Sequence, residues 1–88
     1  MSFKNKVAIV TGAGQGIGFE ICKDLAAEGA HIILNDIDQT LADKAAKYIV
    51  EDIRGNCIAL AGDSGDTLFI QKMVDNAVEH LGKLDIAI

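Results

Sequence analysis

The stretch VTGAGQGIGFE, residues 10–20, places four glycines at alternate positions directly after an apolar run. That run, KVAIV at residues 6–10, is rich in β-branched residues and has the length of a buried strand. After the glycines, apolar residues recur at helical spacing, at Ile17, Ile21, Cys22, Leu25 and Ala26. A strand, a glycine-rich turn and a helix start in this order indicate a backbone site for an anion, because the first N–H groups of a helix have no partners within the helix.

The alternation of strand and helix continues to the end of the chain. Strands are predicted at residues 6–10, 31–36, 57–61 and 84–88, and the helices between them are predicted to end at Gly29, Gly55 and Gly82. Asp38 is the predicted N-cap of the second helix. The apolar stripes of the second and third helices are Leu41, Ala42, Ala45, Ile49, Val50 and Ile53, and Ile70, Met73, Val74, Ala77, Val78 and Leu81.

This order predicts an α/β fold with a doubly wound parallel sheet, because parallel strands need helical crossovers between them. The strands are apolar throughout, which favours strands covered on both faces. The sequence stops at Ile88, inside the fourth apolar run, before the helices that would complete one face of the sheet. We therefore expect the chain to be the N-terminal part of a longer protein, truncated after the start of the fourth strand. A self-contained small domain is the alternative.

Composition and charge exclude several classes of function. The chain has 88 residues and a net charge of −5, and no cluster of Lys or Arg that would favour nucleic acid or an anionic membrane surface. Its apolar runs are too short to span a membrane, and its N-terminus lacks the apolar core of a signal peptide, so a cytoplasmic protein is expected. Cys22 and Cys57 match no metal-binding spacing and are predicted to be reduced core thiols.

The spacing of the glycines narrows the kind of anion site. No Gly-Lys-Ser/Thr follows them, which excludes a Walker A loop, and the third glycine of G-x-G-x-x-G is replaced by isoleucine or phenylalanine in either register. Thr11, Gly12, Gly16 and Gly18 match T-G-x-x-x-G-x-G. Gly12, Gly14 and Gly16 match G-x-G-x-G, which resembles the loop of S-adenosylmethionine-dependent methyltransferases.

The first of these spacings resembles the cofactor loop of the short-chain dehydrogenases/reductases. The resemblance extends over all 88 residues: NDI ends the second strand, GDSGD follows the third, and GKLDIAI resembles the approach to the Asn-Asn-Ala-Gly segment of the family. It implies that residues 1–88 form the N-terminal part of a Rossmann-type dinucleotide-binding domain. It also implies an NAD(P)-dependent oxidoreductase that transfers hydride between the cofactor and a small alcohol or carbonyl substrate.

The resemblance and the spacing together nominate the cofactor-binding residues, which are Gly12, Gln15, Gly16, Ile17, Gly18, Asp36, Ile37, Asp63 and Ser64. Asp36 lies 18 residues after Gly18, close to the roughly 20 expected of an acid that binds the ribose hydroxyls. Its charge would repel the 2′-phosphate of NADP, and Gln15 stands where NADP-preferring relatives often have Arg or Lys, so NAD is the predicted cofactor.

Each of these roles has a structural alternative. Asp36 could be an ordinary turn carboxylate. The resemblance implies that Ile37 packs on the face of the adenine, but it could simply fill the loop. Asp63 and Ser64, expected at the edge of the adenine, could instead cap the third helix.

The catalytic residues of the resembled family, an Asn, a Ser and a Tyr-x-x-x-Lys, are not among these 88 residues. The only tyrosine, Tyr48, is predicted to lie on the second helix as a structural residue. The fourth strand would be an unprotected edge and one sheet face would lack helices, so the isolated chain is expected to self-associate or to be only marginally folded. A homo-oligomer is expected of the protein. Two other functions stay open at this point: a methyltransferase segment and a non-catalytic nucleotide-binding module.

Overall fold

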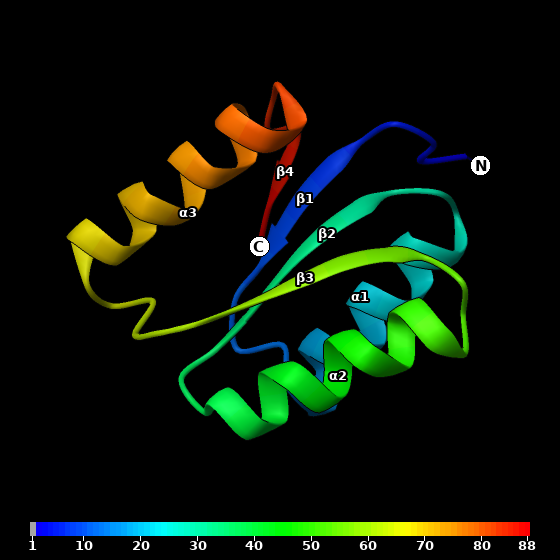
Figure 1. The fold of residues 1–88 in the computed structure, drawn as a ribbon, viewed down its shortest axis with the longest axis horizontal. Helices are drawn as coiled ribbons and strands as arrows, with labels where there is room; N and C mark the ends of the chain where they lie inside the picture. The colour runs from blue at the N-terminus through cyan, green and yellow to red at the C-terminus, as the bar shows by residue number, and fades with distance from the viewer. Residues whose placement is uncertain (1) are drawn as a thin grey trace.

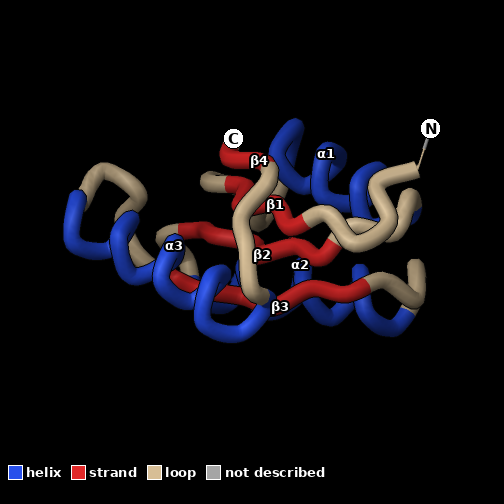
Figure 2. The backbone as a smooth tube through the Cα atoms, turned by 90° about the horizontal axis from the view of Figure 1, so that it is seen from above, coloured by secondary structure: helices blue, strands red, loops and turns tan. Residues whose placement is uncertain are grey.

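The computed structural model describes residues 2–88 and contains alternating strands and helices. The elements are β1 (Val7–Val10), α1 (Gly16–Ala27), β2 (His31–Asp36), α2 (Gln39–Glu51), β3 (Asn56–Ala61), α3 (Thr67–Leu81) and β4 (Ile86–Ala87). The four strands form one parallel sheet in the order β3-β2-β1-β4, which Figure 2 shows from above. The chain therefore builds outward from β1 to β3 and then crosses back to place β4 on the other side of β1. This topology confirms the predicted doubly wound fold.

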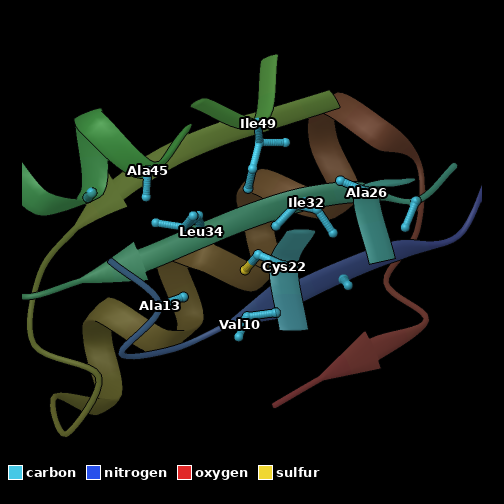
Figure 3. Packing of buried hydrophobic residues seen from close by; sticks show 11 residues of the cluster. Val10, Ala13, Cys22, Ala26, Ile32, Leu34, Ala45 and Ile49 are labelled. Atoms are coloured by element: carbon cyan, nitrogen blue, oxygen red, sulfur yellow. The ribbon is translucent and has the colours of Figure 1, made fainter. Parts of the chain in front are cut away.

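The helices divide between the two faces of the sheet, with α1 and α2 on one face and α3 on the other (Figure 1). Successive residues of a strand point to opposite faces, so β1 supplies Ala8 and Val10 to the first face and Val7 and Ile9 to the second. Figure 3 shows the core of the first face, where the labelled residues are Val10, Ala13, Cys22, Ala26, Ile32, Leu34, Ala45 and Ile49. The central strands are buried on both faces as predicted.

The prediction of coverage on both faces is wrong for β3. This strand lies at the edge of the sheet, its first residue Asn56 is exposed, and 44% of the surface of Ile58 remains accessible. The reason is that α3 packs over Val7, Ile9 and Ile33 of the two central strands and leaves the outer part of β3 uncovered. Three predicted members of the stripes of α2 and α3 are also exposed, namely Val50, Ile70 and Val78.

The helix ends agree with the sequence at two positions and differ at the third. Gly29 and Gly82 adopt left-handed backbone angles, with φ of 98° and 81°, as a glycine after a helix commonly does. In contrast, α2 ends at Glu51, and it is Arg54 that takes the left-handed conformation, with a φ of 64°. Gly55 is needed for a different reason, because a Cβ there would lie 2.9 Å from the Cβ of Ala26.

The fourth strand is shorter than the predicted span of residues 84–88. Asp85 lies directly before β4 and makes two hydrogen bonds to Val7 of β1. Its Oδ2 accepts one from the Val7 N–H at 2.9 Å, and its N–H donates one to the Val7 carbonyl. The Val7 N–H and the Lys83 ammonium, 3.2 Å away, hold the pKa of the Asp85 carboxyl below its ordinary value. Asp85 thus fixes the start of β4 beside the start of β1.

The two cysteines lie in or against the core, as the sequence predicted. Cys22 is buried and Cys57 partly buried, both are free thiols, and burial raises the pKa of each to about 12. Within residues 2–88, none of the helices combines the length and the apolar character that crossing a membrane requires.

Candidate functional site

The candidate site lies at the carboxyl end of the parallel sheet, where β1, β2 and β3 end. Because these parallel strands are neighbours, the loops that follow them lie side by side, and the nominated residues lie in those loops, at the end of β2 and in the first turn of α1. Two backbone hydrogen bonds join the loops: the Ala13 N–H donates to the Asn35 carbonyl at 2.7 Å, and the Gly62 N–H donates to the Asp36 carbonyl at 3.0 Å. The structure therefore brings the three predicted segments together.

The glycines of the first loop have two different functions. Gly12 and Gly16 have φ of 59° and 66°, which disfavour other residues, and a Cβ at either position would meet nothing within 4 Å. The space beside them is therefore open to a ligand. At Gly18, however, a Cβ would lie 2.8 Å from the carbonyl oxygen of Gly12 and 3.0 Å from the Cα of Ala13. Only glycine lets the first turn of α1 pack this closely against its own loop.

The N-terminus of α1 has the properties of an anion site. Its N-cap residue, Gln15, is extended, and within the described residues 2–88 its side chain makes no capping hydrogen bond and the first turn has no acidic residue. The N–H groups of the first turn are thus free of a side-chain acceptor, and the helix dipole adds partial positive charge there. Ile17, placed by the sequence both in the apolar stripe of the helix and at the cofactor, is 81% exposed. Its assignment to the core stripe is wrong, and its position beside the loop suits contact with a ligand.

Asp36 is held in one orientation by two backbone groups. Its Oδ2 accepts a hydrogen bond from the Gly14 N–H and its Oδ1 accepts one from the Asp38 N–H, both at 3.0 Å. Only 9% of the residue is exposed. An ionised carboxylate can accept about four hydrogen bonds, so acceptor positions remain after these two. The bond to Asp38 shows that Asp36 does stabilise its own turn, and this role is compatible with binding ribose hydroxyls.

The sequence did not single out two residues that shape this site. Gly14 is one, because its N–H holds Asp36 and a Cβ there would lie 2.8 Å from the Cβ of Leu41. Asn35 is the other, since its buried Nδ2 donates to the carbonyls of Leu60 at 3.0 Å and Gly62 at 3.1 Å, tying the end of β3 to β2. An amide inside an apolar strand that is predicted to be buried must find such partners, and this was the available signal.

In the turn after β3, the residue that caps α3 is not one of the two that the sequence offered. The N-cap of α3 is Asp66, whose carboxylate accepts a hydrogen bond from the Leu68 N–H at 2.9 Å, so capping by Asp63 or Ser64 is wrong. The Asp63 carboxylate instead accepts a hydrogen bond from the Gly65 N–H at 2.8 Å and shapes the turn. Ser64 lines a pocket of about 280 Å³ between this turn and the end of β1, together with Thr11 and Ile70. Ile37, directly after Asp36, is 73% exposed.

The structural role predicted for Tyr48 is consistent with its surroundings. Its ring lies edge-on to that of Phe19, with the ring centroids 5.8 Å apart, and the Lys23 ammonium sits over both rings. In the part of the chain that the structure describes, no group of three or more His, Cys, Asp or Glu residues could hold a metal ion.

The sheet and its glycine-rich loop define the class of dinucleotide-binding α/β proteins. The model of the short chain dehydrogenase family matches residues 6–88, and the chain belongs to that family. The resemblance found in the sequence is thereby confirmed, and the methyltransferase alternative is not favoured.

Individual relatives agree with this assignment. Versicolorin reductase stcU of Emericella nidulans is 42% identical over 84 residues, which are 92% of this chain and 31% of that protein. The structure of L-sorbose reductase from Gluconobacter frateurii, complexed with NADPH and L-sorbose, matches 99% of this chain and 33% of its own, with 30% identity and a TM-score of 0.92. Carveol dehydrogenase from Mycobacterium avium, in complex with NAD, matches 97% of this chain and 35% of its own, with 31% identity and a TM-score of 0.85. The chain spans about a third of the length of the relatives it matches.

Proposed function

We propose that this chain is the NAD-binding part of an oxidoreductase that transfers hydride between NAD and the alcohol or carbonyl carbon of a small molecule. The nicotinamide cofactor supplies the hydride chemistry when it is bound. The catalytic Asn, Ser and Tyr-x-x-x-Lys of the family are not among these 88 residues, so the part played by this chain is to bind and orient the cofactor. The observation that supports this proposal best is the Asp36 carboxylate, fixed beside the open N-terminus of α1.

The residues at the site fit an adenine dinucleotide. In our proposal the loop residues Gly12, Gln15, Gly16, Ile17 and Gly18 hold the pyrophosphate, because the loop offers open space and helix N–H groups. Asp36 accepts hydrogen bonds from the ribose hydroxyls next to the adenine. Exposed Ile37 covers one face of the adenine, and the turn with Asp63 and Ser64 meets its edge.

The proposed preference for NAD over NADP rests on charge. A 2′-phosphate would lie next to the Asp36 carboxylate and be repelled by it. The carboxylate could turn away only by breaking its hydrogen bonds to the N–H groups of Gly14 and Asp38. Residues 12–20 and 37–43 contain no Lys or Arg that could neutralise that phosphate. The relatives support a nicotinamide cofactor in general, since one structure holds NADPH and the other NAD.

Calorimetric titration of the full product of the gene that encodes this chain tests the proposal. NADH should bind more tightly than NADPH, and Asp36→Ala should reduce that preference by roughly tenfold or more, as expected for loss of hydrogen bonds to a charged group. Asp43→Ala is the matched control, because it removes an exposed carboxylate of α2 that accepts a hydrogen bond from the Gln39 side chain. Tighter binding of NADPH, or of S-adenosylmethionine alone, would contradict the proposal.

We further propose that residues 1–88 are the N-terminal part of a Rossmann-type domain in a cytoplasmic homo-oligomer. The two free cysteines are in keeping with a reducing compartment. The uncovered part of β3 and the exposed side chains of Ile70 and Val78 on α3 are apolar surfaces of the kind that associate.

A further inference from the structure

Gly14 occupies a position in the loop that the T-G-x-x-x-G-x-G spacing leaves free. We propose that Gly14 determines cofactor specificity: because it has no side chain, its N–H can hold the Asp36 carboxylate in the orientation that favours NAD over NADP. This inference rests on the proposed function and adds to it a second residue, outside the spacing that defines the loop.

The requirement for glycine at this position comes from contact and not from backbone conformation. Gly14 is not among the residues with a positive φ, unlike Gly12 and Gly16. A Cβ at Gly14 would lie 2.8 Å from the Cβ of Leu41, 2.9 Å from Oδ2 of Asp36 and 3.0 Å from its Cγ. At Gly12 and Gly16 the same added atom would meet nothing within 4 Å. Gly14 is therefore the loop glycine whose missing side chain makes room for the acidic group.

The two groups that a new Cβ would meet differ in how easily they move. The Cβ of Leu41 is attached directly to the backbone of α2, whose next residue, Ala42, is fully buried in the core. The Asp36 carboxylate can turn about its side-chain torsions, which costs less than moving a packed helix. Turning it would break its hydrogen bonds to the N–H groups of Gly14 and Asp38. The contact with Leu41 therefore shifts the backbone of residue 14, and the contact with Asp36 turns the carboxylate; both changes separate the residue 14 N–H from Oδ2 of Asp36.

The consequence is specific to the discrimination between cofactors. NADH would bind more weakly, because its ribose would lose hydrogen bonds to the carboxylate. NADPH would bind more tightly, because the carboxylate would lie farther from its 2′-phosphate. The groups proposed to hold the pyrophosphate are common to both cofactors, and the nearest contacts of the new Cβ lie on Leu41 and Asp36. The ratio of the NADPH and NADH dissociation constants is therefore the quantity that Gly14 should control.

A double-mutant cycle on that ratio tests the inference in the full gene product. We expect Gly14→Ala to lower the ratio by about tenfold, and Asp36→Ala to lower it at least as much. The double variant should match Asp36→Ala, since Gly14 acts only through the carboxylate. The ratio compares two cofactors on one variant, so a smaller folded fraction does not change it. Gly55→Ala is the control, because its Cβ would meet Ala26 at 2.9 Å, at the opposite edge of the sheet, and it should leave the ratio unchanged.

The outcomes separate the two proposals. An unchanged ratio in Gly14→Ala, with the expected loss in Asp36→Ala, would overturn the role of Gly14 alone. A further loss in the double variant beyond that of Asp36→Ala would also overturn it, since Gly14 would then act by another route. An unchanged ratio in Asp36→Ala would overturn the proposed NAD preference itself. If Gly14→Ala does not fold, Asp36→Glu is the substitute, because it keeps the negative charge but moves it past the Gly14 N–H. An unchanged ratio in Asp36→Glu would contradict the inference, and a lower ratio would support it.

Discussion

Three helices begin at the carboxyl end of the parallel sheet, and they differ in whether a side chain caps the N–H groups of the first turn. The first turn of α2 is capped by Asp38, which accepts a hydrogen bond from the Leu41 N–H at 3.1 Å. That of α3 is capped in the same manner by Asp66, from the Leu68 N–H at 2.9 Å. Over residues 2–88, the first turn of α1 receives no such bond, although its N-cap residue Gln15 has the extended backbone of a cap.

We interpret this difference as one between helices whose first turns serve the fold and a helix whose first turn is proposed to bind a ligand. A side-chain cap satisfies a donor locally and contributes about 1 kcal/mol to stability. At α1 the contribution is absent, the loop before it contains Gly12 and Gly14, and the space beside Gly12 and Gly16 is open. An anion that binds there would supply the missing acceptor and stabilise the folded protein in proportion to its affinity.

The largest loss of NADH affinity is expected from Gly18→Ala, which forces the first turn of α1 away from the glycine loop. The new Cβ would lie 2.8 Å from the Gly12 carbonyl oxygen and 3.0 Å from the Ala13 Cα, and both are backbone atoms that cannot turn aside. We expect destabilisation by about 1–3 kcal/mol and a loss of NADH affinity of roughly a hundredfold. Thermal unfolding and calorimetry measure the two effects. Gly82→Ala is the control, because it strains a left-handed residue at the other edge of the sheet and should lower stability alone.

Much of this comparison was available from the sequence, and the reason is that local patterns determine it. The strand and helix periods predicted the element order, and the cap at Asp38 was predicted from its place before an apolar stripe. The cap of α3 was not assigned correctly, because GDSGD offers several polar residues and only the geometry selects Asp66. The exposure of β3 was also missed, since it depends on which strand becomes the edge of the sheet.

The sequence indicated the candidate residues that match a known spacing, and it missed those whose role arises from tertiary contacts alone. The T-G-x-x-x-G-x-G spacing pointed to the glycines that are left-handed, Gly12 and Gly16. It could not assign Gly14, whose contacts with Asp36 and Leu41 exist only once α2 has packed beside the loop. Asn35 likewise acquires its function from β3, the strand that begins 21 residues later.

A second, smaller effect is expected from giving α1 the cap that the other two helices have. In Gln15→Asp the new carboxylate can accept a hydrogen bond from an N–H group of the first turn, since the residue is already extended. We expect a gain in stability of about 1 kcal/mol together with a loss of NADH affinity of roughly tenfold, because the carboxylate competes with the pyrophosphate and repels it.

The neutral variant Gln15→Asn separates the two causes of that loss. It caps the helix without a charge, so it should raise stability by a similar amount and weaken NADH less. Higher stability without any loss of NADH affinity in Gln15→Asp would show that the cofactor does not use this helix end.

The smallest effect on binding is expected from removing a cap that the fold uses for itself. Asp66→Ala leaves the Leu68 N–H without its acceptor and should destabilise the protein by about 1 kcal/mol, measured by chemical unfolding. NADH affinity should stay within about twofold, because the Asp63 turn is held by the backbone bond from the Asp66 N–H to the Asp63 carbonyl, which the substitution keeps. Asp66→Asn retains a cap and should restore most of the stability. If Asp66→Ala weakened NADH as strongly as Gly18→Ala does, the first turn of α3 would belong to the cofactor site, and the division between structural and ligand-binding helix ends would fail.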